Sequence, residues 1–300
     1  MKMRFLKFTG YLLVTIVALL AVGAVAVYFA SNARMKKTFA VAVRPVAIPA
    51  DAGAIARGKH LAETRGCNDC HGKDYAGGKV IDDGAMGTVH APNLTRGRGG
   101  RIATFTDEDW VRAIRHGVGP DKGGLLIMPS EEYSHFSDPD LGAIVAYLKT
   151  VPAVDRERVP IALGPVARVL LASGKMKLPA EVIDHANLRP ATVEKGVTVD
   201  YGRYVATACI GCHGPNLSGG KIAIGPPSWP PAANLTPHAD GRLAKWSEAD
   251  FLKTVRTAKR PDGTELNEVM PRVFGAMDDT ELKAVWAFLK SLPPAATGAR

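Results

Sequence analysis

Apolar residues fill one long stretch near the N-terminus. Thr9 to Ala33 carries no charged side chain, and its apolar centre, Tyr11 to Ala30, is about the 20 residues that cross a bilayer as a helix. A cleaved signal peptide is the alternative, because Ala24-Val25-Ala26 has the small-x-small form of a cleavage site. The apolar run is longer than the usual signal-peptide core of about 7 to 15 residues. This favours an uncleaved membrane anchor, followed by a linker, over residues 1–50.

Beyond residue 50 the apolar positions recur at spacings of three and four, which predicts helices with one buried face. Two such helices begin at Ser137 and Asp278 and end before Pro152 and Pro293. Strand patterns are weak throughout, so the chain is predicted to be all-α. Further helices are predicted at about 53–66, 107–116, 196–208 and 248–258. Capping-box spacing marks two of their starts, at Thr106 with Asp109 and at Ser247 with Asp250.

Two glycines lie inside predicted helices. Gly58 and Gly202 each lie in the predicted helix that precedes a cysteine motif. Glycine costs about 1 kcal/mol relative to alanine in a helix interior. We therefore expect a packing reason for each, such as close crossing by the helix that ends the same domain.

The sequence contains an internal repeat of two units. Met128 follows Cys67 by 61 positions, Met270 follows Cys209 by the same 61, and a proline follows each methionine. An Asn-Leu-Thr triplet recurs between them, at 93–95 and 234–236. The repeat predicts two tandem domains behind the anchor, at 51–152 and 196–294, with a C-terminal tail at 295–300. Residues 153–195 have no counterpart and are predicted to be an inter-domain linker that packs on one or both units, with a short helix from Pro165 to Leu171.

The formal charge of +9 is concentrated at the N-terminus. Residues 1–50 hold seven Lys or Arg and no acid, which leaves 31 basic and 29 acidic residues in the remainder. A nucleic-acid reader would spread its basic residues over the folded part of the chain. The charge therefore belongs to the flanks of the membrane segment, and no nucleic-acid partner is expected.

Cys67-Asn68-Asp69-Cys70-His71 and Cys209-Ile210-Gly211-Cys212-His213 carry the chemistry. Two cysteines separated by two residues and followed by histidine are the attachment signature of a c-type haem. Half a zinc knuckle or a redox dithiol is the alternative for one such copy. The two copies lie 142 positions apart, each has the histidine, and the chain has four cysteines in all. Two haems therefore account for every thiol, with His71 and His213 as proximal iron ligands.

The second iron ligand decides between a carrier and an enzyme. Met128 and Met270 are predicted because they lie at the same distance from the two motifs, and a thioether ligand would close the iron to substrates. Met277 rivals Met270, while His116 and His135 rival Met128. Met86, Met176 and Met277 have no partner in the other unit and are predicted to fill the core, although Met277 is the nearest rival of Met270. Trp110 and Trp246 are predicted either to hydrogen-bond haem propionates or to pack in the core.

The ordered motifs, CxxCH, Asn-Leu-Thr, Met-Pro and a closing helix ending in Tyr/Phe-Leu-Lys, resemble class I cytochromes c. More narrowly, they are similar to the repeated domains of the cytochrome subunits of membrane-bound alcohol and gluconate dehydrogenases. The resemblance covers about 51–152 and 196–294. It implies thioether attachment of two haem c groups at Cys67, Cys70, Cys209 and Cys212, with His71, Met128, His213 and Met270 as iron ligands. It also implies that a proline carbonyl accepts the proximal histidine's N–H. Pro92 fits this role in the first unit, and Pro226 or Pro227 is expected to take it in the second, where Ala233 replaces Pro92.

These expectations describe a two-haem electron carrier held in the bacterial inner membrane by one N-terminal helix, with both haem domains in the periplasm. Electrons would pass from a dehydrogenase, or another quinol-side donor, to a terminal oxidase or another cytochrome. No residue is predicted to be catalytic. The alternative is a dihaem peroxidase-type enzyme, in which one iron keeps an open position.

Overall fold

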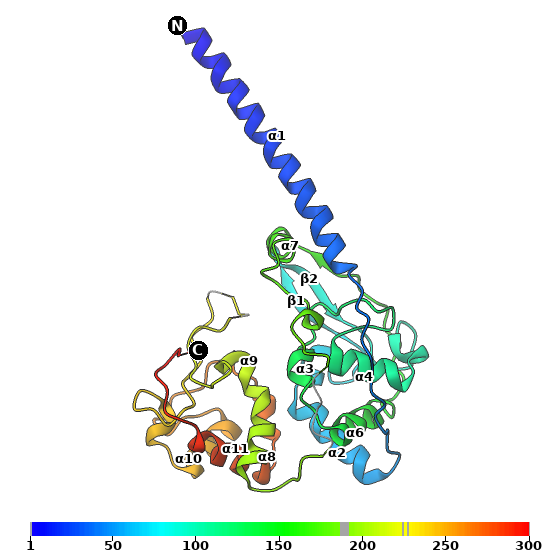
Figure 1. Cartoon of the computed structure of the whole chain (residues 1–300), viewed down its shortest axis with the longest axis vertical. Coiled ribbons are helices and arrows are strands. Elements are labelled where there is room, and N and C mark those ends of the chain that lie inside the picture. Colours follow the sequence, from blue (N-terminus) through cyan, green and yellow to red (C-terminus); the bar gives the residue numbers. More distant parts are fainter. Residues whose placement is uncertain (1, 187–191, 224, 227, 300) are drawn as a thin grey trace.

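A long N-terminal helix and two helical domains make up the structure, a computed structural model that describes residues 2–186, 192–223, 225–226 and 228–299. Helix α1 (Lys2–Met35) projects away from both domains (Figure 1). Its Lys7–Met35 part is long and apolar enough to cross a membrane, and its central residues are exposed rather than packed against the protein. This is the apolar N-terminal helix that the sequence predicts.

The first domain is built on a crossing of its first and last helices, α2 and α6. Gly58 of α2 lies at this crossing, where an added Cβ would stand 1.9 Å from the carbonyl oxygen of Ala143 in α6. The expected packing reason for Gly58 is therefore confirmed. The helices of this domain are α2 (Ala52–Thr64), α3 (Cys67–His71), α4 (Asp107–His116), α5 (Ser130–Tyr133) and α6 (Asp138–Leu148), with the 3-10 helix η1 (Arg101–Thr104).

The second domain repeats this arrangement with α8 and α11. An added Cβ at Gly202 of α8 would lie 1.9 Å from the carbonyl oxygen of Ala284 in α11. The two predicted glycine crossings thus have the same geometry. The helices of this domain are α8 (Val199–Val205), α9 (Ile210–His213), α10 (Glu248–Thr257) and α11 (Asp279–Ser291), with the 3-10 helices η3 (Ala206–Cys209), η4 (Arg242–Lys245) and η5 (Arg272–Ala276).

Local capping signals place the helix starts where the sequence predicts them. Reciprocal capping boxes join Thr106 to Asp109 at the start of α4 and Ser247 to Asp250 at the start of α10. Ser137 caps α6, and Asp278 caps α11. These caps satisfy N–H groups that a helix start otherwise leaves unpaired.

A small antiparallel sheet was not expected. Strands β1 (Gly78–Asp83) and β2 (Gly87–Ala91) form a hairpin in the first domain, and β3 (Ala162–Leu163) of the linker pairs with β2. The described residues are mostly helical, as predicted, so the sheet is an addition to the helical fold. It follows directly after α3 and therefore lies beside the first cysteine motif.

The linker packs on the first domain and on the membrane helix. After β3, helix α7 (Pro165–Ala172) packs against α1, and the 3-10 helix η2 (Pro179–Glu181) follows. Glu181 forms ion pairs with Arg34 and Lys37 at the end of α1, at 2.6 and 2.9 Å. Helix α7 matches the short helix predicted from Pro165 to Leu171.

Direct polar contacts join the two domains. The Tyr204 hydroxyl of α8 donates to Asp140 Oδ2 of α6 at 2.6 Å and accepts from the Ser137 backbone N–H at 3.2 Å. Asp140 is buried and also pairs with Arg57 of α2 at 2.5 Å. The interface therefore includes the buried Asp140 carboxylate. Arg57 of the same domain balances its charge, and Tyr204 of the second domain adds a hydrogen bond.

Candidate functional site

Each cysteine motif forms a short helix that ends at a glycine with a positive φ angle. In α3, Gly66 and Gly72 flank Cys67–His71 with φ angles of 74° and 78°. Such positive φ angles cost glycine little and other residues more. In the second domain η3 and α9 carry the motif, and Gly214 follows His213 with a φ of 80°. Both motifs therefore present their two cysteines and histidine from one or two tight helical turns.

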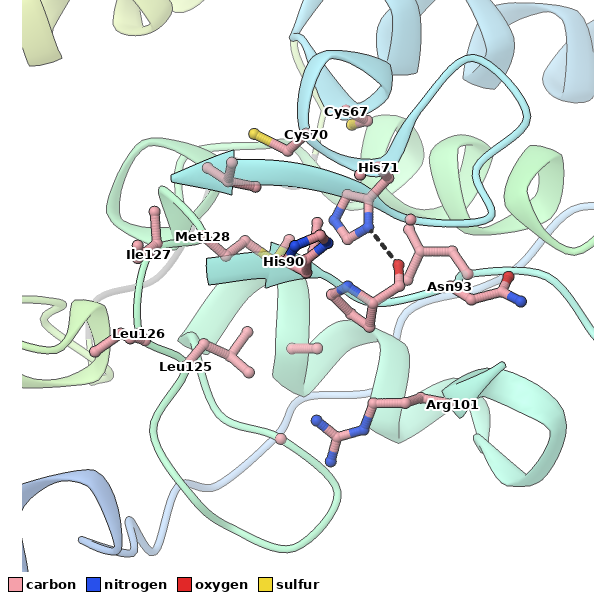
Figure 2. A pocket seen from close by; sticks show the side chains of 18 of the residues that line it. Cys67, Cys70, His71, His90, Asn93, Arg101, Leu125, Leu126, Ile127 and Met128 are labelled. Carbon is pink, nitrogen blue, oxygen red and sulfur yellow. Dashed lines mark hydrogen bonds between the residues drawn. The ribbon is translucent and has the colours of Figure 1, made fainter. Parts of the chain in front are cut away.

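A backbone carbonyl orients each histidine. His71 Nδ1 donates to the carbonyl oxygen of Pro92 at 2.9 Å, as Figure 2 shows. His213 Nδ1 donates in the same way to the carbonyl oxygen of Ala233 at 2.7 Å. Because a carbonyl can only accept, each Nδ1 carries the proton and each Nε2 keeps its lone pair for a metal.

The second acceptor corrects one sequence expectation. Pro226 or Pro227 was expected to hold His213, but Ala233, the counterpart of Pro92, does so. Pro227 lies outside the described residues. A peptide carbonyl is the same acceptor whichever side chain its residue carries, so replacing proline with alanine leaves the hydrogen bond intact.

The surroundings of both histidines keep the imidazoles neutral. Burial lowers the pKa of His71 and His213, and the carbonyl hydrogen bond of each opposes this shift with a smaller effect. A neutral imidazole is the form that ligates a metal. Both histidines are therefore held in the neutral form that can bind a metal.

The cysteines have the properties of protonated thiols. Burial raises the pKa of Cys67 and Cys209 to about 12, and it also raises the pKa of Cys70 and Cys212. All four are free of disulfides. A raised thiol pKa makes Cys67 and Cys209 less reactive in dithiol exchange, which uses the thiolate.

A cavity of about 470 Å³ opens beside the first motif. It borders Cys67, Cys70 and His71, and Met128 lies on its wall with the loop that leads to it (Figure 2). Its size lies within the roughly 300–1,000 Å³ of small-molecule and cofactor sites. The rest of the lining is mostly apolar and comes from α4, α6, the sheet and the linker, including Val89, Leu94, Phe105, Trp110, Ile114, Ile144, Leu148, Val159 and Ile161.

Basic side chains also line this cavity. Arg101 precedes α4, and Arg156 and Arg158 come from the linker. Arg156 also donates to the carbonyl oxygen of Gly77 and pairs with Asp74. An apolar hollow with guanidinium groups and a metal-ready imidazole suits a flat apolar cofactor that carries carboxylates and a metal, as haem does.

The two predicted methionine ligands differ in what surrounds them. Met128 lines the cavity that His71 borders, so the structure brings this pair together. Met270 is half-buried in the segment before η5, and its pairing with His213 stays a prediction. Its rival Met277 is 3% exposed and packs in the core of the second domain.

The other predicted alternatives lie elsewhere. The imidazole of His116 approaches that of His185 of the linker, with Nδ1 atoms 3.0 Å apart, and neither His116 nor His135 is among the residues that border the first cavity. Trp110 does border the cavity and is buried. Trp246 packs, half-buried, against the core of the second domain.

Sequence reasoning missed His90. It lies on β2 and lines the first cavity together with His71 and Met128 (Figure 2). Its position two residues before Pro92, the carbonyl acceptor, was the available signal. The corresponding position in the second unit is Pro231, so His90 distinguishes the two sites.

The Asn-Leu-Thr triplets tie the site loop to the end of each domain. Asn93 Nδ2 donates to the carbonyl oxygen of Val154 at 2.8 Å, and Thr95 Oγ1 donates to the same oxygen at 3.1 Å. Asn234 and Thr236 make the matching bonds to the carbonyl oxygen of Ala295, at 2.7 and 3.1 Å. Each Asn follows the histidine's carbonyl partner directly, so the triplet fixes the loop that positions the imidazole.

Two helical domains with carbonyl-held CxxCH histidines and a crossing of first and last helices are features of class I c-type cytochromes, and each domain matches a cytochrome c family model. Residues 199–293 match the family model described as Cytochrome c, and residues 53–148 match the model described as Cytochrome C oxidase, cbb3-type, subunit III. Cytochrome c domains imply covalently bound haem c.

Curated relatives agree with this class. The chain is 27% identical over 275 residues to the fructose dehydrogenase cytochrome subunit of Gluconobacter japonicus, a match that covers 83% of this chain and 54% of the relative. It is 27% identical to the cytochrome c subunit of the quinone alcohol dehydrogenase of Gluconobacter oxydans, over 83% of this chain and 57% of the relative. It is 25% identical to a diheme cytochrome c-type protein of Cereibacter sphaeroides, over 80% of this chain and 86% of the relative. The chain thus spans a little over half the length of the dehydrogenase subunits.

Proposed function

We propose that this chain is a membrane-anchored electron carrier with two haem c groups, one in each domain. Cys67 and Cys70 would attach the first, and Cys209 and Cys212 the second. The support is the repeated motif together with the identical treatment of His71 and of its counterpart in the second domain, each neutral, buried and held at Nδ1 by a backbone carbonyl.

Met128 and Met270 are proposed as the distal ligands. Met128 lies on the cavity wall beside His71, and Met270 holds the same place in the repeat. If the histidine and the methionine of each domain bound the iron, neither iron would keep a position for a substrate. When bound, haem c supplies a one-electron couple. The protein's part is to fix the ligands, exclude water with the apolar lining and place basic groups near the carboxylates of the cofactor.

The class of the relatives supports a proposed direction of electron transfer. Several are cytochrome subunits of dehydrogenases, so a membrane-bound or periplasmic dehydrogenase is the proposed donor. A terminal oxidase or another cytochrome is the proposed acceptor, and a shorter match to a CcoP subunit of a cbb3-type oxidase supports the oxidase. Helix α1 would hold the chain in the bacterial inner membrane, with both domains in the periplasm. Encounters with soluble partners would be brief, as is usual for electron-transfer pairs.

One experiment tests the ligand set and the carrier function together. Full-length holoprotein, purified from membranes, is titrated potentiometrically while the sulfur-to-iron charge-transfer band is recorded. We expect two one-electron transitions, and loss of part of the band in Met128→Ala and in Met270→Ala. Met277→Leu is the matched control, because Met277 is a buried methionine outside the ligand set.

The same preparations distinguish the carrier from the peroxidase-type enzyme. The reduced wild-type protein should bind carbon monoxide poorly, because both irons are closed by methionine. Rapid carbon monoxide binding by the wild type, or a band unchanged in Met128→Ala, would contradict the proposal. In the second case His90→Ala shows whether the other imidazole of the first cavity is the ligand instead.

A further inference from the structure

We propose that α7 is an interfacial helix, which lies in the surface of the bilayer beside the exit of α1 and fixes the first domain's orientation to the membrane. The inference rests on the membrane anchor of the proposed function and goes beyond it. The anchor holds the chain at the membrane, whereas α7 would determine which way the first domain faces.

Contacts with α1 determine where α7 lies along the membrane normal. Arg168 Nη1 donates to Ser31 Oγ at 2.9 Å and to Asn32 Oδ1 at 3.0 Å, and its guanidinium lies 4.6 Å from the centre of the Tyr28 ring. Ser31 is completely buried by this packing. Residues 28 to 32 lie at the end of the apolar centre of α1, where a spanning helix leaves the hydrocarbon and where tyrosine is enriched. Helix α7 therefore lies at the level of the headgroups.

One face of α7 is apolar and exposed. Ala167 and Leu171 are buried, whereas Val166 and Val169 are 46% and 51% exposed. Val166 and Val169 are three residues apart and so share a helix face. Single exposed valines on a soluble surface need no explanation. Here the helix packs against the end of the membrane-spanning α1, and this position identifies the bilayer as the partner of the exposed face.

The charges around α7 do not by themselves select the partner. Lys36 follows α1 directly, Lys175 and Lys177 follow α7, and all three are exposed. Asp82 and Asp83 lie near the hairpin tip that contacts the start of α7 through a Val166 N–H to Ala85 O bond. Because both signs are present, the apolar face, rather than attraction to anionic lipid, carries the proposed contact.

The connection from α7 to the first site is short and close-packed. Strand β3 ends two residues before α7 and pairs with β2, whose Val89 and His90 line the cavity. An added Cβ at Gly87 would lie 2.0 Å from the carbonyl oxygen of Ala162, so β2 and β3 are in tight contact. A helix fixed in the membrane surface would therefore also fix the orientation of the first cavity.

The test uses site-directed spin labels on holoprotein in phosphatidylcholine vesicles, where the native thiols are occupied by the cofactor. Labels at Val166→Cys and Val169→Cys should collide with oxygen, which concentrates in lipid, and lose collisions with a water-soluble nickel chelate. Val197→Cys is the matched control, because it is an exposed valine (55%) away from α1 and should stay accessible to the chelate.

A fourth label separates this inference from the anchor. Leu20→Cys lies in the centre of α1 and should report lipid. If the label at Leu20 is in lipid while those at 166 and 169 are as accessible to the chelate as the one at 197, the interfacial helix is wrong and the anchor stands. If the label at Leu20 is itself accessible to the chelate, the anchor fails and the inference fails with it.

Discussion

His60 Nε2 lies 2.6 Å from Glu281 Oε2, and this contact joins the two domains across 221 positions of the chain. His60 is on α2, whereas Glu281 is in the first turn of α11 and is fully buried. Arg65, also on the first-domain side, lies 3.9 Å from the other carboxylate oxygen. A buried carboxylate needs such partners, so the second domain depends on the first for the environment of Glu281.

Removing the imidazole should weaken the interface. His60→Ala leaves the buried Glu281 carboxylate with one partner fewer, which should cost about 1–3 kcal/mol of unfolding free energy. Chemical denaturation of the holoprotein in detergent measures this loss. His238→Ala is the matched control, because His238 pairs with Asp240 at the same 2.6 Å on an exposed surface, where ion pairs contribute about 0–1 kcal/mol. Equal effects of the two substitutions would show that burial of Glu281 does not matter.

The unfolding free energy should fall in acid, in part because Glu281 becomes protonated. Burial raises the pKa of Glu281, but the His60 hydrogen bond and the Arg65 charge outweigh it, so the pKa is below its ordinary value. The stabilising contribution is then complete above the unfolded pKa, about 4.3, and is lost as the pH falls through the lower folded value. Asp278 also has a lowered pKa and faces Lys195.

The contribution of Glu281 to stability is therefore measured as the difference in unfolding free energy between wild type and a Glu281 variant. Unfolding free energies of wild type and Glu281→Gln, measured from pH 7 downward, should converge below about pH 4.3. Exposed Glu268→Gln serves as the control. A constant difference between wild type and Glu281→Gln over this range would refute the assignment.

The helix crossings predict a large effect of a single methyl group. At Gly58 and Gly202 an added Cβ would lie 1.9 Å from a backbone carbonyl oxygen of the closing helix, so the helices must separate. Overpacking of this kind typically costs about 1–3 kcal/mol. Alanine's better helix propensity returns about 1 kcal/mol at most. Thermal unfolding of Gly58→Ala and Gly202→Ala should show lower midpoints, whereas Gly84→Ala, with no atom within 4 Å of the added Cβ, should not.

Features that depend on local chemistry or on the repeat could be predicted from the sequence. The capping boxes at Thr106 and Ser247 act within four residues, and the glycine crossings are visible because the repeat places Gly58 and Gly202 alike. The carbonyl partner of His213 was predicted wrongly because the family pattern places a proline there. The hydrogen bond uses the backbone, to which the Ala233 side chain is irrelevant.

Features that depend on contacts between distant, unrepeated segments could not be predicted. Strand β3 has two residues, and its pairing with β2 is visible only once the linker is folded back onto the first domain. The same holds for His90, which enters the cavity because β2 does, and for the His60 contact with Glu281. His90 is replaced by Pro231 in the other unit. The His60 contact with Glu281 is matched by the bond between Tyr204 and Asp140, but both contacts lie between two domains that the repeat does not place relative to each other.

The Asn-Leu-Thr triplets give the last prediction, because they link stability to the histidine's orientation. Asn93 Nδ2 donates to Val154 O while its Oδ1 accepts from the Thr95 N–H at 2.8 Å, and Asn234 makes the same pair of bonds in the second domain. Asn93→Ala should leave the buried Thr95 N–H unpaired and the Val154 carbonyl oxygen with one donor fewer, at about 1–3 kcal/mol. It should also loosen the adjacent Pro92 carbonyl, and with it His71.

The two domains allow this effect to be localised. Asn93→Ala should change the potential and charge-transfer band of one haem, and Asn234→Ala those of the other, in the same potentiometric titration. Asn216→Ala is the control, because Asn216 also donates to a backbone carbonyl, at 2.6 Å, but is exposed. If Asn93→Ala behaved like Asn216→Ala in both unfolding and potential, the triplet would not hold the loop, and the geometry of His71 would have to depend on α3 alone.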